Sequence, residues 1–273
     1  MPVSKLLVEG KLDVEILSAI DGMPPVIRGG SKQSLPPRAR TERQAGSSPD
    51  VCYLRDRDFD YDPPDDVSQP VVDRTHAGIV LGWRWCRHEI ENYLIDPEVV
   101  IAATTWDRAG YEAALVDAAQ RIRHYQIARW VVGTARRSLP PHYELYTKPD
   151  DLQDHDFRLP RDVSESVSVQ WANEHVARFY ERVGQALASQ AISTSIVSRA
   201  ARLTESLFAS AANVLLWCSG KDLLAALEPW LQTQNVPDAG ALRAGMRDWI
   251  INHPENALRC LPEWDSLRQL VQV

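Results

Sequence analysis

The stretch VCYLRDRDFD, residues 51–60, decides the fold expected for this chain. Its first four residues are apolar, as in a short buried strand. Asp56, Asp58 and Asp60 then follow at alternate positions. If the chain stays extended there, the three carboxylates leave the same face, and crowded carboxylates need either a raised pKa or a neutralising cation. Because ligands of open α/β sheets bind outside the carboxyl ends of strands, Asp56 and Asp58 predict a magnesium or manganese site. A solvated acidic loop is the alternative.

The first hundred residues alternate strand and helix patterns. Residues 6–8, 26–27 and 78–83 are further apolar runs ended by glycine or charged residues, and residues 12–20 carry apolar side chains at helical spacing. Residues 31–50 are expected to form a partly helical connection. This alternation predicts an α/β fold with a mainly parallel sheet flanked by helices.

The pattern changes after Pro97, where long amphipathic helices are expected. The clearest are residues 111–125, 174–188 and 198–216, and residues 138–164 interrupt them as a proline-rich and acidic loop. Two more helical stretches, residues 221–232 and 241–253, lie near the end. The expected division is a catalytic core over residues 1–97, a helical domain over 98–213 and a C-terminal helical segment over 214–273.

Composition limits the class of protein. The chain has 273 residues, 44% of them hydrophobic, and a formal net charge of −7, which weakens the idea of a uniformly basic nucleic-acid binder. The four cysteines lack Cys-x-x-Cys spacing, so neither a zinc site nor a disulfide framework is indicated. No apolar run is long enough for a signal or membrane segment, and a cytoplasmic protein with no membrane partner is expected.

A second acidic pattern occurs at residues 8–13, VEGKLD. Glu9 ends the first expected strand, and Gly10 permits a sharp turn, so the Glu9 carboxylate can point to the same edge as Asp56. Asp13 either caps the following helix or reaches that edge. An acid at a helix start is commonly only a cap, but its combination with Asp56-x-Asp58 is more specific.

Glu9-Gly10 together with Asp56-x-Asp58 resembles the TOPRIM catalytic core of topoisomerases, bacterial primases and several nucleases. Residues 88–94, HEIENYL, and 220–224, GKDLL, resemble the OLD-type TOPRIM nucleases. Among these they look like the nuclease subunits that anti-phage systems such as PARIS pair with a separate ABC-type ATPase. The resemblance covers residues 5–97 and the segment near residue 220. It implies a nuclease that acts as a toxic defence effector.

The resemblance also implies roles for the acids. Asp56 and Asp58 would hold one or two Mg²⁺ or Mn²⁺ ions, and Glu9 would bind the metal or act as a general base. Lys221 would stabilise the charge of the transition state. Glu91, which is favoured over Glu89, would supply a ligand for a second metal. The other acidic candidates for metal ligands are Asp13, Asp60 and Glu89.

Two groups of basic residues are candidates for contact with a phosphate backbone. One follows residues 26–27 and includes Arg28 and Lys32. The other lies in a stretch without acids and includes Arg121, Arg123 and Arg129. Gly220-Lys221 is not a nucleotide-binding loop, since Leu215 and Asp222 stand where that motif needs glycine and serine or threonine. Any ATP dependence is therefore expected from a partner ATPase.

Two other functions stay open. A HAD-like phosphatase would use Asp56 as nucleophile and Asp58 as general acid. This alternative leaves residues 8–10 and 89–92 unexplained. A non-catalytic TOPRIM subunit for assembly or sensing would tolerate Glu9→Ala and Asp56→Ala. Whether the substrate is DNA or an RNA such as tRNA, and whether the chain forms a homo-oligomer, are also open.

Overall fold

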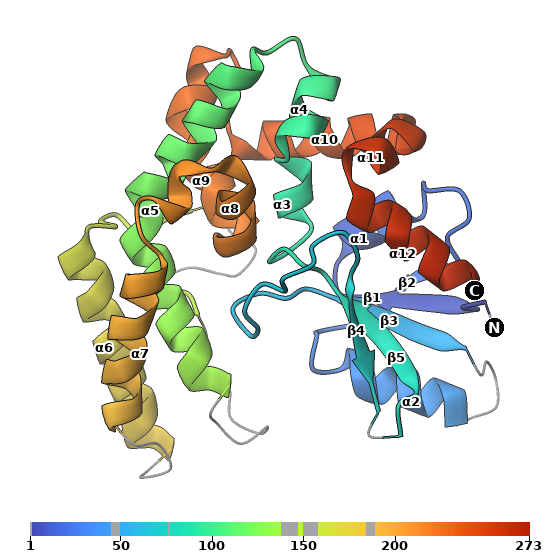
Figure 1. Ribbon diagram of the computed structural model, residues 1–273, viewed down its shortest axis with the longest axis horizontal. Helices are drawn as coiled ribbons and strands as arrows, with labels where there is room; N and C mark the ends of the chain where they lie inside the picture. Colours follow the sequence, from blue (N-terminus) through green and yellow to red (C-terminus); the bar gives the residue numbers. More distant parts are fainter. Residues whose placement is uncertain (1, 45–49, 76, 138–146, 150–157, 184–188) are drawn as a thin grey trace. The chain divides into compact units, whose positions relative to one another are not determined.

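The structure is a computed structural model that describes residues 2–44, 50–75, 77–137, 147–149, 158–183 and 189–273. The chain divides into two compact units (Figure 1). The sheet unit comprises Met1–Arg57, Pro63–Thr105 and Leu242–Val273, and the helical unit comprises Asp58–Asp62 and Trp106–Ala241. The sequence-based boundaries at residues 97 and 213 differ from this division, because residues 98–105 and 242–273 belong to the sheet unit.

The sheet unit contains five strands and most of the short helices. Its elements are β1 (Lys5–Val8), α1 (Lys11–Leu17), β2 (Val26–Arg28), α2 (Leu35–Gln44), β3 (Val51–Arg55), β4 (Val71–Arg74), β5 (Val80–Arg84), α3 (Glu91–Leu94), α4 (Pro97–Ala103), α11 (Pro254–Cys260) and α12 (Pro262–Gln272). Helix α10 (Ala239–Asn252) begins in the helical unit and continues into the sheet unit.

The sheet has the order β2-β1-β3-β5-β4, and all pairs are parallel except β4 with β5. Leu7 pairs with Tyr53, and Tyr53 with Gly82, so β1, β3 and β5 end at the same edge. Leu6, Leu7 and Val8 are all buried, as expected for a central strand covered on both faces. The α/β fold with a mainly parallel sheet is therefore confirmed.

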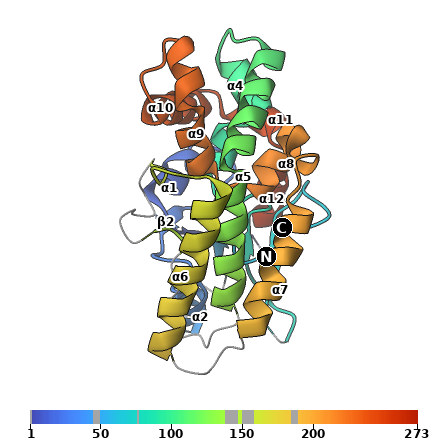
Figure 2. The same cartoon turned by 90° about the vertical axis from the view of Figure 1, so that its left-hand side faces the viewer.

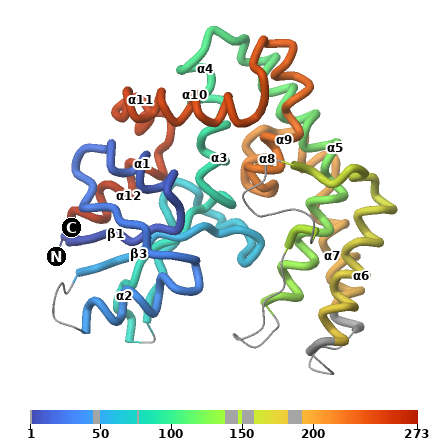
Figure 3. The backbone as a smooth tube through the Cα atoms, turned by 180° about the vertical axis from the view of Figure 1, so that it is seen from behind, coloured from blue at the N-terminus to red at the C-terminus, as the bar shows by residue number. Residues whose placement is uncertain are grey.

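Helices cover both faces of the sheet. Helix α2 lies on one face, whereas α1 and α12 lie on the other (Figure 3). Under α2, Leu35 and Ala39 form one core cluster with Leu7, Tyr53 and Leu81. The backbone N–H of Val3 donates to the carbonyl of Val271 at 2.8 Å, so the two ends of the chain lie together.

The helical unit is built around the 30-residue helix α5 (Figure 2). Its elements are α5 (Arg108–Arg137), α6 (Glu165–Val183), α7 (Ser189–Arg202), the 3-10 helix η1 (Leu207–Ala209), α8 (Ala211–Trp217) and α9 (Gly220–Thr233). Helix α5 packs against α6, α7, α8 and α9. Alanine and valine side chains of α5, such as Ala128 and Val132, pack against Val176 and Phe179 of α6.

Candidate functional site at the carboxyl edge of the sheet

Glu9 and Asp56 meet at the carboxyl edge of the sheet. Each directly follows its strand, β1 or β3, and these strands are parallel neighbours. The Oε1 atom of Glu9 accepts a hydrogen bond from the backbone N–H of Asp56 at 3.0 Å. Both residues are half-buried. The structure thus brings together two acids that are 47 residues apart in the sequence.

Three of the parallel strands end in arginine at this edge, a feature that the sequence analysis noted only for Arg28. Arg28 ends β2, and its Nε donates to the carbonyl of Glu9 at 3.3 Å. Arg55 and Arg84 end β3 and β5 and are paired in register. Both bind Asp73 of β4, at 2.7 and 3.0 Å. Two guanidinium groups therefore share one carboxylate beside the segment that carries Asp56.

Asp13 is a helix cap. Its Oδ2 accepts the backbone N–H of Gly10 at 3.1 Å, and the residue is 6% exposed. This bond satisfies one of the free N–H groups at the start of α1. Of the two roles expected for Asp13, the structure shows the capping one. Lys32, which was grouped with Arg28, lies half-buried in the connection between β2 and α2.

The alternation expected for Asp56, Asp58 and Asp60 is not found. Strand β3 ends at Arg55, and Asp58 has a φ of 48°, which breaks the extended conformation. Asp58 and Asp60 belong to the helical unit, where Asp60 forms an ion pair with Arg136. Only Asp56 of the three therefore directly follows the strand in the sheet unit.

Glu89 and Glu91 are both buried in the sheet unit. Glu91 is the first residue of α3, and its carboxylate lies 3.2 Å from Arg243 of α10. The backbone N–H of Glu89 donates to Oδ1 of Asn92 at 3.2 Å, which forms a turn before the helix. Glu91 was favoured as a metal ligand, but the contact seen here is an ion pair that joins α3 to α10.

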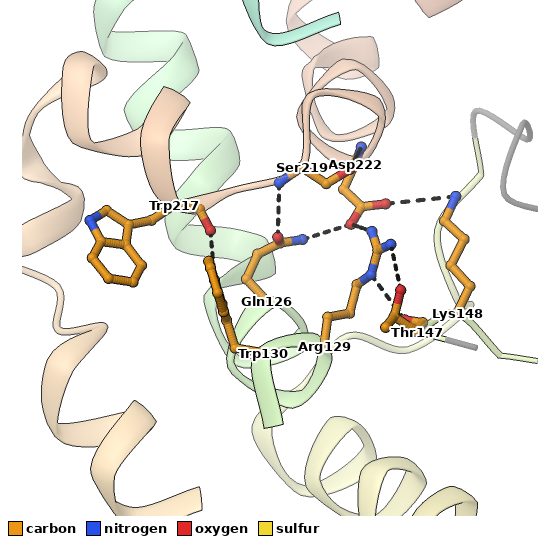
Figure 4. Close-up of polar contacts among 8 residues, drawn as sticks. All are labelled: Gln126, Arg129, Trp130, Thr147, Lys148, Trp217, Ser219 and Asp222. Carbon is orange, nitrogen blue, oxygen red and sulfur yellow. Dashed lines mark hydrogen bonds and ion pairs between the residues drawn. The ribbon is translucent and has the colours of Figure 1, made fainter. Parts of the chain in front are cut away.

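Lys221 lies in the first turn of α9, in the helical unit, directly before Asp222. Asp222 is fully buried and pairs with Arg129 and, at 3.8 Å, with Lys148 (Figure 4). Gln126 also donates to Asp222, at 2.8 Å. The sequence analysis missed Asp222. Its only sequence signal is the spacing Ser219-x-x-Asp222, typical of a helix start.

The arginines of α5 have partners within the helical unit. Arg129 is 6% exposed and belongs to the network just described, so the prediction that it binds a phosphate backbone does not fit its burial. Arg121 donates to the carbonyl of Ala226 at 2.6 Å, and Arg123 lies 3.2 Å from Glu205. Residues 121–137 contain no acid, but Arg121 and Arg123 find hydrogen-bond acceptors in α9 and in the segment before η1.

Glu9 and Asp56 at the sheet edge fit a magnesium site in which a bound substrate supplies further oxygen ligands. In the described part of the chain, no three His, Cys, Asp or Glu side chains group closely enough to hold a metal ion. Magnesium is often held by one or two carboxylates, several waters and substrate phosphates, and Glu9 with Asp56 supplies two carboxylates. These two residues would therefore hold the ion together with a phosphate.

No model of a known protein family matches the sequence, and no curated protein does so either. Among the described helices, none has the length and apolar character needed to cross a membrane.

Proposed function

We propose that the chain is a metal-dependent endonuclease that hydrolyses phosphodiester bonds in nucleic acid. The observation that supports it most is the contact of Glu9 with Asp56 at the ends of two parallel strands. Two acids from distant parts of the chain meet where sheets of this kind bind ligands. The TOPRIM resemblance of Glu9-Gly10 and Asp56-x-Asp58 gives these acids their proposed chemistry.

In this proposal Glu9 accepts a proton from the attacking water, whose oxygen forms the new bond to phosphorus. The bond from phosphorus to the leaving sugar oxygen breaks, and that oxygen takes up a proton from solvent water. Asp56 would hold the cation, and Glu9 would bind to it through a water molecule. When bound, the cation supplies positive charge to the phosphate and the water. Arg28, Arg55 and Arg84 contact neighbouring phosphates, since guanidinium groups match phosphate geometry.

Asp58 and Lys221 keep the roles of metal ligand and charge-stabilising cation as predictions. Both residues lie in the helical unit. The partner ATPase, the role as an anti-phage effector and an RNA such as tRNA as substrate belong to the same proposal. They rest on the resemblance of residues 88–94 and 220–224 alone.

The test is cleavage of plasmid DNA, single-stranded DNA and total tRNA by the purified chain, with Mg²⁺, Mn²⁺ or EDTA. Glu9→Gln and Asp56→Asn should each lower cleavage by about 100-fold or more, because they remove a base or a ligand but keep the size of the side chain. Glu112→Gln is the matched control, since Glu112 is a partly exposed acid on α5, with a side chain that is 41% exposed. Cleavage that survives Glu9→Gln would refute the proposal.

A small aryl phosphate ester is the second substrate. Turnover of this ester by the wild-type chain, abolished by Asp56→Asn but retained in Glu9→Gln, would instead support the phosphatase, in which Asp56 is the nucleophile. The proposed nuclease is expected to leave the ester intact, because it recognises neighbouring phosphates through the strand-end arginines.

A further inference from the structure

Arg129 of α5 contacts two segments that are far apart in the sequence. Its guanidinium lies 4.4 Å from the centre of the Phe59 ring, and its Nη1 forms an ion pair with Asp222. Nε and Nη2 donate to the carbonyl and the hydroxyl of Thr147, at 2.9 and 3.2 Å (Figure 4). Phe59 follows Asp58, and Asp222 follows Lys221, so one side chain joins both segments that the sequence analysis selected.

The segment Asp58–Asp62 is seated on α5 by several contacts. Phe59 packs edge-on against Trp130, with ring centres 5.2 Å apart. A Cβ atom at Gly133 would lie 2.5 Å from the carbonyl oxygen of Phe59, so glycine allows the segment to lie directly on the helix. Arg136 pairs with Asp60, and Arg137 donates to the carbonyl of Phe59 at 2.5 Å.

The start of α9 is held by the same part of α5. Gln126 accepts the backbone N–H of Ser219 at 3.1 Å and donates to Asp222 at 2.8 Å. Asp222 is fully buried, so its charge needs a close cation, and Arg129 supplies one. Gln126, Arg129 and Gly133 are three and four residues apart and therefore share one face of α5.

We propose that Arg129 is a positioning residue that couples the segment Asp58–Asp62 to the start of α9. Its planar group bonds Asp222 and Thr147 through its edge and packs on Phe59 through its face, which lysine cannot do. A change at either segment then alters the other, and Asp58 and Lys221 take defined positions together. The coupling stands on these contacts, whereas its importance for catalysis rests on the proposed nuclease function.

Hydrogen–deuterium exchange of the full chain tests the coupling without an activity assay. Arg129→Lys keeps a positive charge for Asp222 but loses the fork and the ring contact. Amide exchange should become about tenfold faster both in residues 57–62 and in residues 219–224. Exchange in β5 should stay unchanged. Arg108→Lys is the control, because Arg108 is an exposed arginine at the start of α5.

Gly133→Ala disturbs the other end of the coupling. The added methyl group displaces Phe59 but removes no polar contact of Asp222. Faster exchange in residues 57–62 accompanied by faster exchange in residues 219–224 would support the coupling. A change confined to residues 57–62 would overturn it.

The catalytic consequence is measured separately. If wild-type protein cleaves nucleic acid, Arg129→Lys should lower kcat at least tenfold and leave KM within about twofold, since the residue lies in the buried network and contacts no substrate. An unchanged kcat in a variant with faster exchange would overturn the positioning role. Absence of cleavage by the wild type would instead count against the nuclease proposal, and the exchange results would still decide the coupling.

Discussion

At the scale of the residue, Gly82 shows how closely β3 and β5 approach. A Cβ atom at this position would lie 2.2 Å from the backbone oxygen of Tyr53 and 2.7 Å from its ring. We predict that Gly82→Ala lowers the free energy of unfolding by about 2 kcal/mol, because the buried strands cannot separate without losing contacts. Urea denaturation measures this. Gly245→Ala, with open space around its Cβ in α10, should show no loss.

Arg84 carries the second prediction at this scale. If the strand-end arginines contact phosphates, Arg84→Gln should weaken binding of single-stranded nucleic acid. The negative slope of log affinity against log salt concentration should also become shallower by about one unit. Fluorescence anisotropy at several salt concentrations, with Ca²⁺ in place of Mg²⁺, gives the slope. Arg108→Gln is the control. An unchanged slope in Arg84→Gln would remove Arg84 from the binding surface.

Single residues also show how far the site was predictable. Glu9 and Asp56 were accessible to sequence analysis, because an acid that directly follows a parallel strand must lie at the carboxyl edge. Asp58 was misplaced, because nothing in the sequence shows that the strand ends at Arg55. The ion pairs of Glu91 with Arg243 and of Asp222 with Arg129 were not predictable, since the two residues of each pair are more than 90 residues apart along the chain.

At the scale of the element, α12 is fixed to the sheet unit by Glu263 near its start. This buried carboxylate accepts the backbone N–H of Cys86 at 2.7 Å and the hydroxyl of Tyr93. Burial raises the pKa of Glu263 above its ordinary value of 4.5, although the hydrogen bonds from Tyr93 and Cys86 oppose the shift. Folding therefore shifts the ionisation equilibrium of Glu263 toward the protonated form, relative to the unfolded chain.

The sign of the pH effect follows from this raised pKa. Protonated Glu263 contributes to the free energy of unfolding, and this contribution is fully present below the unfolded-state pKa near 4.5. The contribution is lost as pH rises through the higher folded-state pKa. Glu263→Gln keeps the acceptor oxygen but does not ionise. We predict that its free energy of unfolding rises relative to wild type as pH increases from 4.5 to 8. Urea titrations at several pH values test this, and a constant difference would contradict it.

Elements differ in how well their sequence predicts them. The strands at residues 26–27, 51–54 and 78–83 were confirmed to within a few residues, because short apolar runs bounded by glycine or charge are specific. Strand β4 was not predicted, because its four residues, VVDR, contain only two adjacent apolar side chains. None of the four residues is fully buried. Helices α4, α11 and α12 lie in stretches that were expected to be helical, but their starts at Pro97, Pro254 and Pro262 were not predicted, although proline favours the first helical position.

At the scale of the whole molecule, the sheet unit is assembled from distant parts of the chain. Residues 242–273 supply α10 after Leu242, α11 and α12 to a unit whose strands all lie before residue 85. Trp264 of α12 is buried and lies 6.0 Å from Trp85 and 5.6 Å from Tyr93, measured between ring centres. The sheet therefore depends on the end of the chain for part of its core.

A chain that ends at Ala241 should lose protection of the sheet, because Trp85, Tyr93 and Cys86 would lose the apolar and polar groups that cover them. Hydrogen exchange in β1, β3 and β5 should then approach that of unfolded peptides. A chain that lacks only Val273, which is 82% exposed, is the matched control and should exchange like the full chain. If β3 stayed protected after removal of residues 242–273, the strands and α1–α4 would form a stable core alone. The boundary predicted after residue 97 would then describe an independent folding unit.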